Sequence, residues 1–181
     1  SGFGFKRKRP SLPYKKNNYI TFGSFNNLLK ISDDVIEVWS TILKKINNSK
    51  LILKSSHKYD VSSTLRKFEK KGVKDSIKIL KRENYPNIED HIDLYNSIDI
   101  SLDTFPYNGV TTTFESLWAG VPVVSLKGFN FNSRCGESIL INGNLNFFLA
   151  ANKDEYIKKC IFLSENIEKL ELERNRLFNK I

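Results

Sequence analysis

The chain alternates short apolar, β-branched runs with stretches of helical periodicity, and this alternation limits its fold more than any other feature. A run such as Leu51-Ile52-Leu53 is apolar throughout, as expected of a strand buried on both faces of a sheet. Strands and helices follow one another about every 20–30 residues. The pattern predicts a Rossmann-like α/β fold, with a parallel sheet covered by helices on both faces.

Apolar spacing and helix start and stop signals place the individual elements. Ser32 is a favourable N-cap, and two acidic residues follow it in the first turn, where the helix dipole favours negative charge. Gly120 and Pro122 end a later helix. The expected strands are 19–25, 51–53, 76–80, 98–102 and 122–126, with 147–150 a short strand or turn. The expected helices are 32–46, 61–71, 90–96 capped by Asp90, 111–119, 134–142, and 153–180 with room for a break.

The composition supports a folded domain and excludes several classes of protein. Apolar residues make up 40% of the 181 residues, which is enough for a core. No apolar run has the length of a membrane span, and no signal-peptide pattern is present. Two cysteines far apart, Cys135 and Cys160, exclude a disulfide scaffold and a four-cysteine zinc site. Two histidines make a His-rich metal site unexpected, so neither metal nor cofactor is predicted.

The first 18 residues differ from the rest because they lack periodicity and are rich in Lys, Pro and Asn. They are expected to form a basic linker or tail, with the Rossmann-like lobe covering 19–181. The formal charge of +9 favours anionic partners, although most lysines are expected to lie on a solvated surface. Residues 6–9 (Lys-Arg-Lys-Arg) form a basic arm without a stacking platform, so nucleic acid is not an expected partner.

Sheets of this class bind ligands beyond the carboxyl ends of their strands. The loops that deserve inspection are therefore 24–31, 54–60, 82–90, 103–112 and 126–134. The sequence holds no P-loop, no G-x-G-x-x-G and no G-x-S-x-G motif, so nucleotide binding or hydrolysis by those devices is unsupported.

The most informative segment, 103–122, runs from a strand through a loop into a helix. Gly109 would let the backbone approach a ligand closely, and the hydroxyls of Thr111 and Thr112 join the free first-turn amides in a site suited to a diphosphate. Glu115 lies on the same helix face as Thr111 and could accept hydrogen bonds from ribose hydroxyls. An equally good explanation makes the threonines helix caps and Glu115 a first-turn partner of the dipole.

Other loops hold weaker candidates. Lys30 could neutralise a leaving diphosphate, His91 could stack on a base, and Arg134 could bind an anion or a sugar. Taken alone, Lys30 is more simply a surface lysine and His91 a surface or capping residue, and Arg134 could merely cap carbonyls. Asp99 and Asp103 lie four apart on one expected strand and could form a carboxylate pair, although a structural role at the strand start is the simpler explanation for Asp99.

Several separated motifs, occurring in the right order from about Tyr19 to the end, resemble the C-terminal catalytic lobe of the O-linked N-acetylglucosamine transferase family, which includes SPINDLY. They are Ile20-Thr-Phe-Gly-Ser-Phe-Asn-Asn, Lys30-Ile31, Trp39 with Ile42-Leu43, Ser49-Lys-Leu-Ile-Leu-Lys54, the segment from Leu102-Asp103-Thr104 to Pro122, and Ser133-Arg134. The resemblance implies a GT-B glycosyltransferase of two Rossmann-like lobes. This chain would be the C-terminal, nucleotide-sugar-binding lobe, and tetratricopeptide repeats precede the lobes in that family.

The resemblance also implies roles for single residues. Lys30 would be catalytic by stabilising the leaving diphosphate, and Glu115 would bind the ribose. His91 would lie near the uracil, whose backbone partner would lie near Pro86. The implied donor-binding residues are Asn27, Lys30, Pro86, His91, Gly109, Val110, Thr111, Thr112 and Glu115, with Arg134 as a further candidate. The sequence departs from the family pattern at Val110, Leu94 and Ile88, which replace a histidine, an arginine and a lysine.

The implied activity is transfer of N-acetylglucosamine from UDP-GlcNAc to Ser or Thr of proteins, with inversion and without a metal. The acceptor would bind through the N-terminal lobe and repeats, so the isolated chain is expected to bind UDP weakly and to transfer no sugar. A cytoplasmic location and no membrane contact are expected. Three alternatives stay open: a related GT-B transferase with another nucleotide sugar or acceptor, a non-enzymatic basic binding module, and a degenerate lobe that has lost its ligand.

Overall fold

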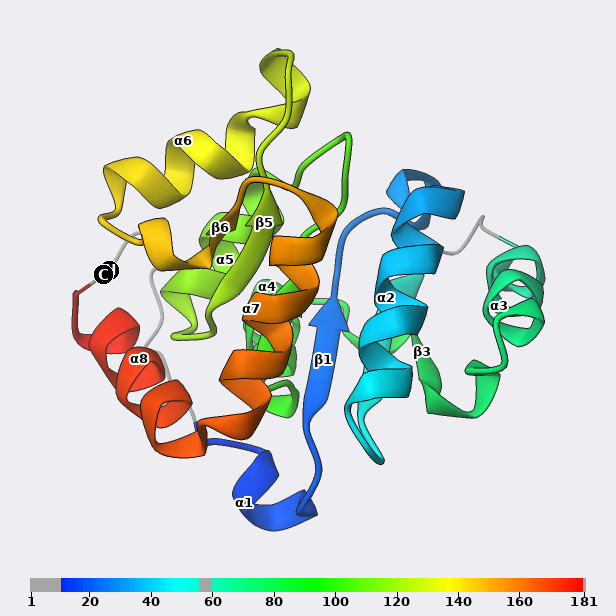
Figure 1. The fold of residues 1–181 in the computed structure, drawn as a ribbon. Coiled ribbons are helices and arrows are strands. Elements are labelled where there is room, and N and C mark those ends of the chain that lie inside the picture. The colour runs from blue at the N-terminus through cyan, green and yellow to red at the C-terminus, as the bar shows by residue number, and fades with distance from the viewer. Residues whose placement is uncertain (1–10, 56–59, 181) are drawn as a thin grey trace.

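A computed structural model describes residues 11–55 and 60–180 of the chain. Its strands are β1 (Thr21–Ser24), β2 (Lys50–Ser55), β3 (Ile77–Lys81), β4 (Ile100–Leu102), β5 (Val123–Leu126) and β6 (Leu149–Ala150). They form a six-stranded sheet in the order β3-β2-β1-β4-β5-β6, and every neighbouring pair is parallel (Figure 1). The predicted fold class is confirmed.

Helices cover both faces of this sheet. They are α1 (Tyr14–Asn17), α2 (Asp33–Lys45), α3 (Val61–Lys70), α4 (Ile88–Asp93), α5 (Thr111–Trp118), α6 (Cys135–Asn142), α7 (Lys153–Glu165) and α8 (Ile167–Lys180). In Figure 1, α2 and α7 lie in front of the sheet and α4 and α5 lie behind it. Short 3-10 turns occur at Leu28–Lys30, Lys74–Ser76, Arg82–Asn84, Leu94–Ser97, Phe131–Ser133 and Asn146–Phe148.

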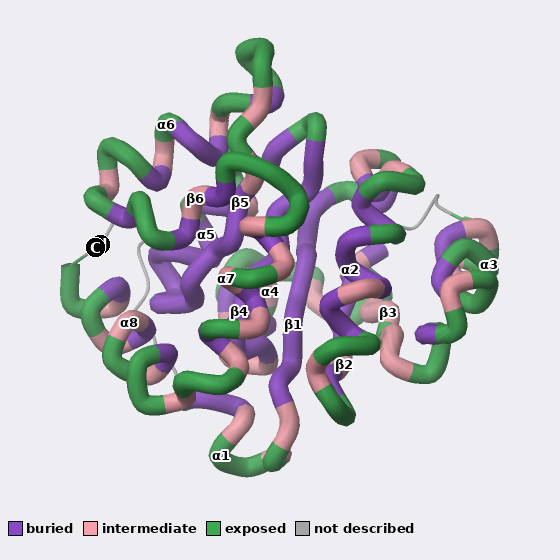
Figure 2. Tube along the Cα trace, viewed as in Figure 1, coloured by how far each residue is buried: buried purple, intermediate pink, exposed green. Residues whose placement is uncertain are grey.

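The two faces of the sheet carry separate apolar clusters. The larger cluster includes Trp39 of α2 and Tyr156 of α7, both fully buried, packed with strand residues such as Phe22. The smaller cluster lies on the α4 side and includes Phe25 and Tyr95. The strands are consequently buried along most of their length (Figure 2), as the apolar runs of the sequence predict.

The strong helix signals are found where they were expected. The Ser32 hydroxyl accepts from the Val35 amide at the start of α2, and Gly120 has the left-handed φ of +76° just after α5. The long C-terminal helix is broken at Asn166, between α7 and α8. None of the helices in the described residues is long and apolar enough to cross a bilayer.

The start of α4 differs from the expectation. Asn87, not Asp90, is the N-cap, and its side chain accepts from the Asp90 amide at 2.9 Å. Asn and Asp are both good caps, and here they are three residues apart, so spacing alone does not choose between them. The helix therefore begins at Ile88, and His91 falls in its last turn, not its first.

Residues 11–18 also differ from the expectation, since the described part of the predicted linker packs on the lobe. Leu12 is buried in the larger cluster, and α1 follows it. The Tyr14 amide donates to Asp99 Oδ1 at 2.9 Å, and the Ser11 carbonyl accepts from Arg174. One apolar side chain and two polar contacts thus order a segment too short to show periodicity. The basic run at 6–9 lies outside the described residues.

The two aspartates of the β4 region do not form a pair. Asp99 precedes β4 and accepts from the Tyr14 and Thr21 amides, whereas Asp103 follows β4 and faces the other end of the sheet. The strand β4 lies between them, so the two carboxylates lie at opposite edges of the sheet. Within the described residues, no group of three or more His, Cys, Asp or Glu side chains is arranged to hold a metal ion.

Candidate functional site

The strand order reverses direction at β1, whose neighbours are β2 on one side and β4 on the other. A cavity of about 430 Å³ opens beyond the carboxyl ends of these strands, and we call it the switch-point cavity. Its lining comes from four segments of the chain: Phe25, Asn26 and Asn27 after β1; Lys54 and Ser55 at the end of β2; Arg82, Tyr85, Pro86, Asn87, Ile88 and His91 after β3; and Thr111, Thr112 and Glu115 on α5.

Most of the sequence-predicted residues gather around this cavity. Those that line it are Asn27, Pro86, His91, Thr111, Thr112 and Glu115. Lys30 and Gly109 lie beside it: Lys30 ends the short turn that Asn27 caps, and Gly109 packs closely against Asn26 and Thr112. Val110 and Arg134 instead line a second hollow on the other side of α5, so the structure does not bring them to the same cavity.

A polar network is buried in the wall of the switch-point cavity. Glu115 is only 6% exposed, and its Oε2 lies 2.9 Å from His91 Nε2 and 3.1 Å from the Tyr95 hydroxyl. Lys54 extends the network, because its Nζ lies 2.5 Å from His91 Nδ1. Burial, together with the charge of Glu115, raises the pKa of Tyr95 well above its ordinary value, so Tyr95 acts as a hydrogen-bond donor here. The arrangement presents a carboxylate held by several donors.

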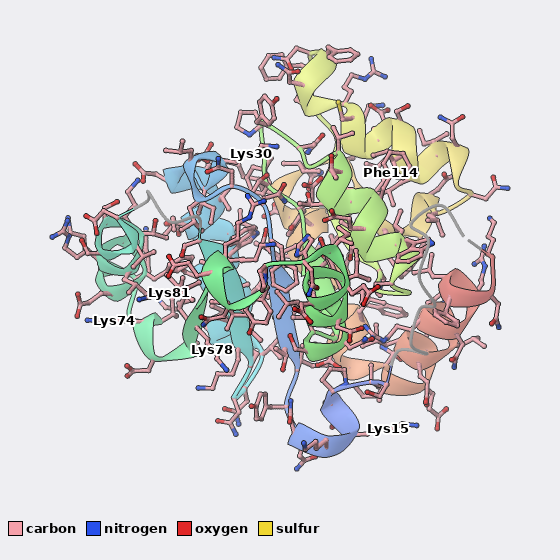
Figure 3. The ribbon with its side chains drawn as sticks, turned by 180° about the vertical axis from the view of Figure 1, so that it is seen from behind. Lys15, Lys30, Lys74, Lys78, Lys81 and Phe114 are labelled. Atoms are coloured by element: carbon pink, nitrogen blue, oxygen red, sulfur yellow. The ribbon has the colours of Figure 1, made fainter. Side chains whose placement is uncertain are left out.

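Lys30 connects two of the loops. Its Nζ donates to the Asn108 carbonyl at 3.0 Å and lies 4.1 Å from the centre of the Tyr107 ring. Burial lowers the pKa of Lys30, and the charge of Asp103 opposes that effect. Figure 3 shows Lys30 and Lys15 at opposite ends of the molecule. Lys30 lies at the end where the parallel strands have their carboxyl ends. An ammonium group is thus held next to the start of α5.

Asp103 holds the loop that leads into α5. Its Oδ1 accepts from the Thr104 and Gly109 amides, at 2.9 and 2.7 Å, and its Oδ2 accepts from the Ser125 hydroxyl at 2.6 Å. Burial raises its pKa to about 6, against these hydrogen bonds and the charge of Lys30. A side chain at Gly109 would collide with the Thr112 hydroxyl and lie 2.9 Å from Asn26 Oδ1. The glycine is therefore required by close packing against protein atoms, and its approach to a ligand stays a prediction.

The N-terminus of α5 has the features of an anion site. Val110 at the N-cap position supplies no side-chain cap, and the first turn holds no acidic residue. The threonines do not act as the cap: the Thr112 hydroxyl donates to Asn26 Oδ1 at 2.8 Å and the Thr113 hydroxyl donates to the Gly109 carbonyl. The first-turn amides thus lack a side-chain cap at the positive end of the helix dipole.

Arg134 has a local partner that its sequence position did not reveal. Its Nε donates to Glu137 Oε2 at 2.7 Å, within the first turn of α6. The hollow that it lines measures about 590 Å³ and also contains the exposed rings of Phe114, Phe129 and Phe131. Phe114 is labelled in Figure 3, on α5.

Comparison with known proteins identifies the family. Residues 6–181 match the family model of glycosyl transferase family 41. The chain belongs to this family. Over 164 residues it is 38% identical to a protein of Eustoma exaltatum subsp. russellianum named as a probable UDP-N-acetylglucosamine–peptide N-acetylglucosaminyltransferase SPINDLY. The match covers 87% of this chain and 17% of that relative, so the chain spans about a sixth of its length.

Solved structures agree with this membership. A point variant of the O-GlcNAc transferase of Thermobaculum terrenum superposes with a TM-score of 0.85 at 31% identity, over 96% of this chain and 34% of that one. WaaG, a glycosyltransferase involved in lipopolysaccharide biosynthesis, has a TM-score of 0.66 at 12% identity, over 97% of this chain and 48% of its own, and shows the fold alone. The fold of this family 41 chain is therefore that of a C-terminal GT-B lobe.

Three residues of the switch-point cavity and its polar network were not expected from the sequence. Lys54, Tyr95 and Asn26 all take part in the cavity wall, yet none was a candidate. A signal existed for Lys54, which is the polar residue that ends a buried strand at the ligand-binding edge. Tyr95 carried no such signal, because its ring packs in the core and only its hydroxyl reaches Glu115.

Proposed function

We propose that this chain is the donor-binding half of a glycosyltransferase that transfers N-acetylglucosamine from UDP-GlcNAc to Ser or Thr of proteins. The observation that carries the proposal is the switch-point cavity, where a buried carboxylate lies one turn after the uncapped N-terminus of the same helix. The printed names of the relatives support the donor and the acceptor class. The acceptor protein would bind through parts of the protein outside this chain, and a cytoplasmic location belongs to the same proposal.

The cavity offers a place for each part of the nucleotide. The base would lie between Pro86 and His91, and Glu115 would accept hydrogen bonds from the ribose hydroxyls. The diphosphate would lie at the N-terminus of α5, where backbone amides and the helix dipole favour anions. Lys30 donates one hydrogen bond to Asn108 and keeps two N–H groups for a phosphate oxygen.

The proposed reaction is a direct displacement at the anomeric carbon, with inversion and without a metal. The acceptor oxygen forms a bond to that carbon, the bond to the diphosphate breaks, and the proton of the hydroxyl passes to solvent. Negative charge then develops on the diphosphate, where Lys30 and the amides at residues 110–112 would stabilise it. Positioning of both reactants supplies much of the rate, and the acceptor side lies outside this chain. The isolated chain is therefore expected to bind the nucleotide without transferring sugar.

A second candidate is the same chemistry with another nucleotide sugar. Ile88 lines the cavity and is apolar and 43% exposed, at a position where the family pattern has a polar side chain. Apolar contacts there would suit a different base or sugar. A panel of UDP, GDP and ADP, each with and without a hexose, distinguishes the two candidates by their affinities.

Calorimetric titration of the chain with UDP and with uridine tests the proposal. Lys30→Ala should weaken UDP binding by about tenfold and leave uridine binding unchanged, because Lys30 acts on the diphosphate; tenfold corresponds to about 1.4 kcal/mol. Glu115→Ala should weaken both ligands, because the ribose is common to them. Lys78→Ala removes a lysine on β3, far from the cavity, and is the matched control. Equal affinities in the wild type and both site variants would contradict the proposal.

A further inference from the structure

Lys54 is a cation of the cavity that the binding scheme above does not use. It extends from the carboxyl end of β2, half-buried, and its Nζ lies 6.0 Å from the centre of the Phe25 ring. The same Nζ lies 2.5 Å from His91 Nδ1, although 37 residues separate the two along the chain. A buried ammonium in direct contact with an imidazole constrains the protonation of that ring.

The contact selects one tautomer of His91. A lysine ammonium only donates hydrogen bonds, so His91 Nδ1 must accept and carry no proton. The ring proton then lies on Nε2, where it donates to Glu115 Oε2 at 2.9 Å. Lys54 therefore donates to His91, and His91 donates to Glu115.

This chain of donors fixes how Glu115 meets a ligand. Both protein donors, His91 Nε2 and the Tyr95 hydroxyl, reach the same oxygen, Oε2. The other oxygen, Oε1, is left as the acceptor for ligand hydroxyls. If the imidazole turned or changed tautomer, Nε2 would lose its proton and Oε2 would lose a donor at a site that is only 6% exposed.

We propose that Lys54 is a positioning residue of the nucleotide site: it holds His91 as the Nε2–H tautomer, and His91 in turn holds Glu115 ready for the ribose. The proposal rests on the function proposed above. Lys54 makes no contact with the reacting atoms in this scheme. It acts through His91 on the orientation of Glu115, which binds the ribose.

The surroundings of Lys54 add a pH dependence. The groups that face it are His91 on α4, Glu115 on α5, and Arg82 and Tyr95 in the turns that flank α4. Burial lowers the pKa of Lys54 to about 8; Glu115 opposes this and Arg82 adds to it. Above that pH the neutral amine can accept as well as donate, and its hold on one tautomer is lost. Nucleotide affinity should therefore fall as pH rises through about 8.

The first test measures the tautomer without any nucleotide. The sequence has two histidines, so a His57→Gln background leaves His91 as the only ring to observe by ¹⁵N NMR. We expect a protonated Nε2 and a bare Nδ1, converting to a mixture of tautomers in Lys54→Met. Lys78→Met should leave the ring signals unchanged, and Figure 3 shows Lys78 away from Lys30 and the cavity end. A ring that keeps the same tautomer in Lys54→Met would overturn the proposal.

The second test is UDP titration of the full chain from pH 7 to about 8.5. We expect Lys54→Met to bind UDP about tenfold more weakly at pH 7. Lys54→Arg should restore the affinity and remove its decline above pH 8, because arginine stays protonated. Wild-type affinity in Lys54→Met, or the same decline in Lys54→Arg, would overturn the proposal. If the wild type bound no UDP, the proposed function would fail, while the NMR result would still decide the role of Lys54.

Discussion

At the scale of single residues, Asp103 shows how one buried carboxylate can build a loop. Its three donors come from Thr104, Gly109 and Ser125, so the start of α5 is fixed to β4 and β5. Those donors favour the ionised form, but burial outweighs them and raises the pKa. The side chain therefore supports the site at a cost in stability that depends on pH.

Asp103→Asn should reveal that cost, because the amide keeps the acceptor for the backbone and can donate to Ser125. A pKa raised from 3.8 to about 6 gives stability that is fully present below pH 3.8 and lost as pH rises through about 6. The free energy of unfolding of the wild type should thus fall relative to Asp103→Asn by about 2 kcal/mol between pH 4 and pH 7. Urea unfolding at several pH values measures the difference, and parallel pH curves would contradict it.

The residues of the site were only partly predictable from the sequence. Thr111, Thr112 and Glu115 share a helix turn, so local spacing places them on one face. Lys54 and His91 meet only because β2 and α4 fold together, and no local pattern encodes that contact. Arg134 pairs with Glu137, only three residues away, and its role as a ligand residue stays a prediction.

At the scale of elements, α8 is anchored by a buried arginine. Arg174 is 1% exposed and donates to the carbonyls of Ile98, Asp99 and Ser11, at 3.0, 2.9 and 3.2 Å. Burial lowers its pKa to about 10, against the charge of Asp99. The last helix is thereby joined to β4 and to the N-terminal segment at once.

Arg174→Met should lower the free energy of unfolding by about 2–4 kcal/mol, because three carbonyls, two of them on buried residues, lose their donor. Arg176→Met is the matched control on the same helix. Arg176 is half exposed and pairs with Glu173 at 3.3 Å, so its loss should cost less than about 1 kcal/mol. Chemical denaturation of the two variants provides the comparison, and equal losses would show that α8 is not anchored through Arg174.

The elements themselves were largely predictable, and the exceptions have physical reasons. β1 and β2 are buried along most of their length, and the apolar run Leu51-Ile52-Leu53 makes β2 visible in the sequence. The helix α1 has four residues and no side-chain cap, so it left no pattern to detect. The N-cap of α4 was misplaced because two capping residues compete within one turn.

At the scale of the whole molecule, the N-terminal segment is part of the lobe from Ser11 onward. A variant that begins at Tyr19 loses the burial of Leu12, worth about 1.5–3 kcal/mol. It also loses the donor from Tyr14 to Asp99 and the acceptor for Arg174. We expect a lower melting temperature than for a variant that begins at Ser11 and keeps these contacts. Equal melting temperatures would show that residues 11–18 are dispensable.

The strand order also determines when the site forms during folding. Phe22 of β1 pairs with Ile100 of β4, so the centre of the sheet closes only when distant parts of the chain meet. Such contacts form slowly. A chain in which β1 and β4 have not yet paired therefore lacks the cavity wall that α5 supplies, and it cannot bind a nucleotide there. A nucleotide that binds only the finished sheet would act as a reporter of folding, and protease resistance gained with UDP would record how many molecules had completed it.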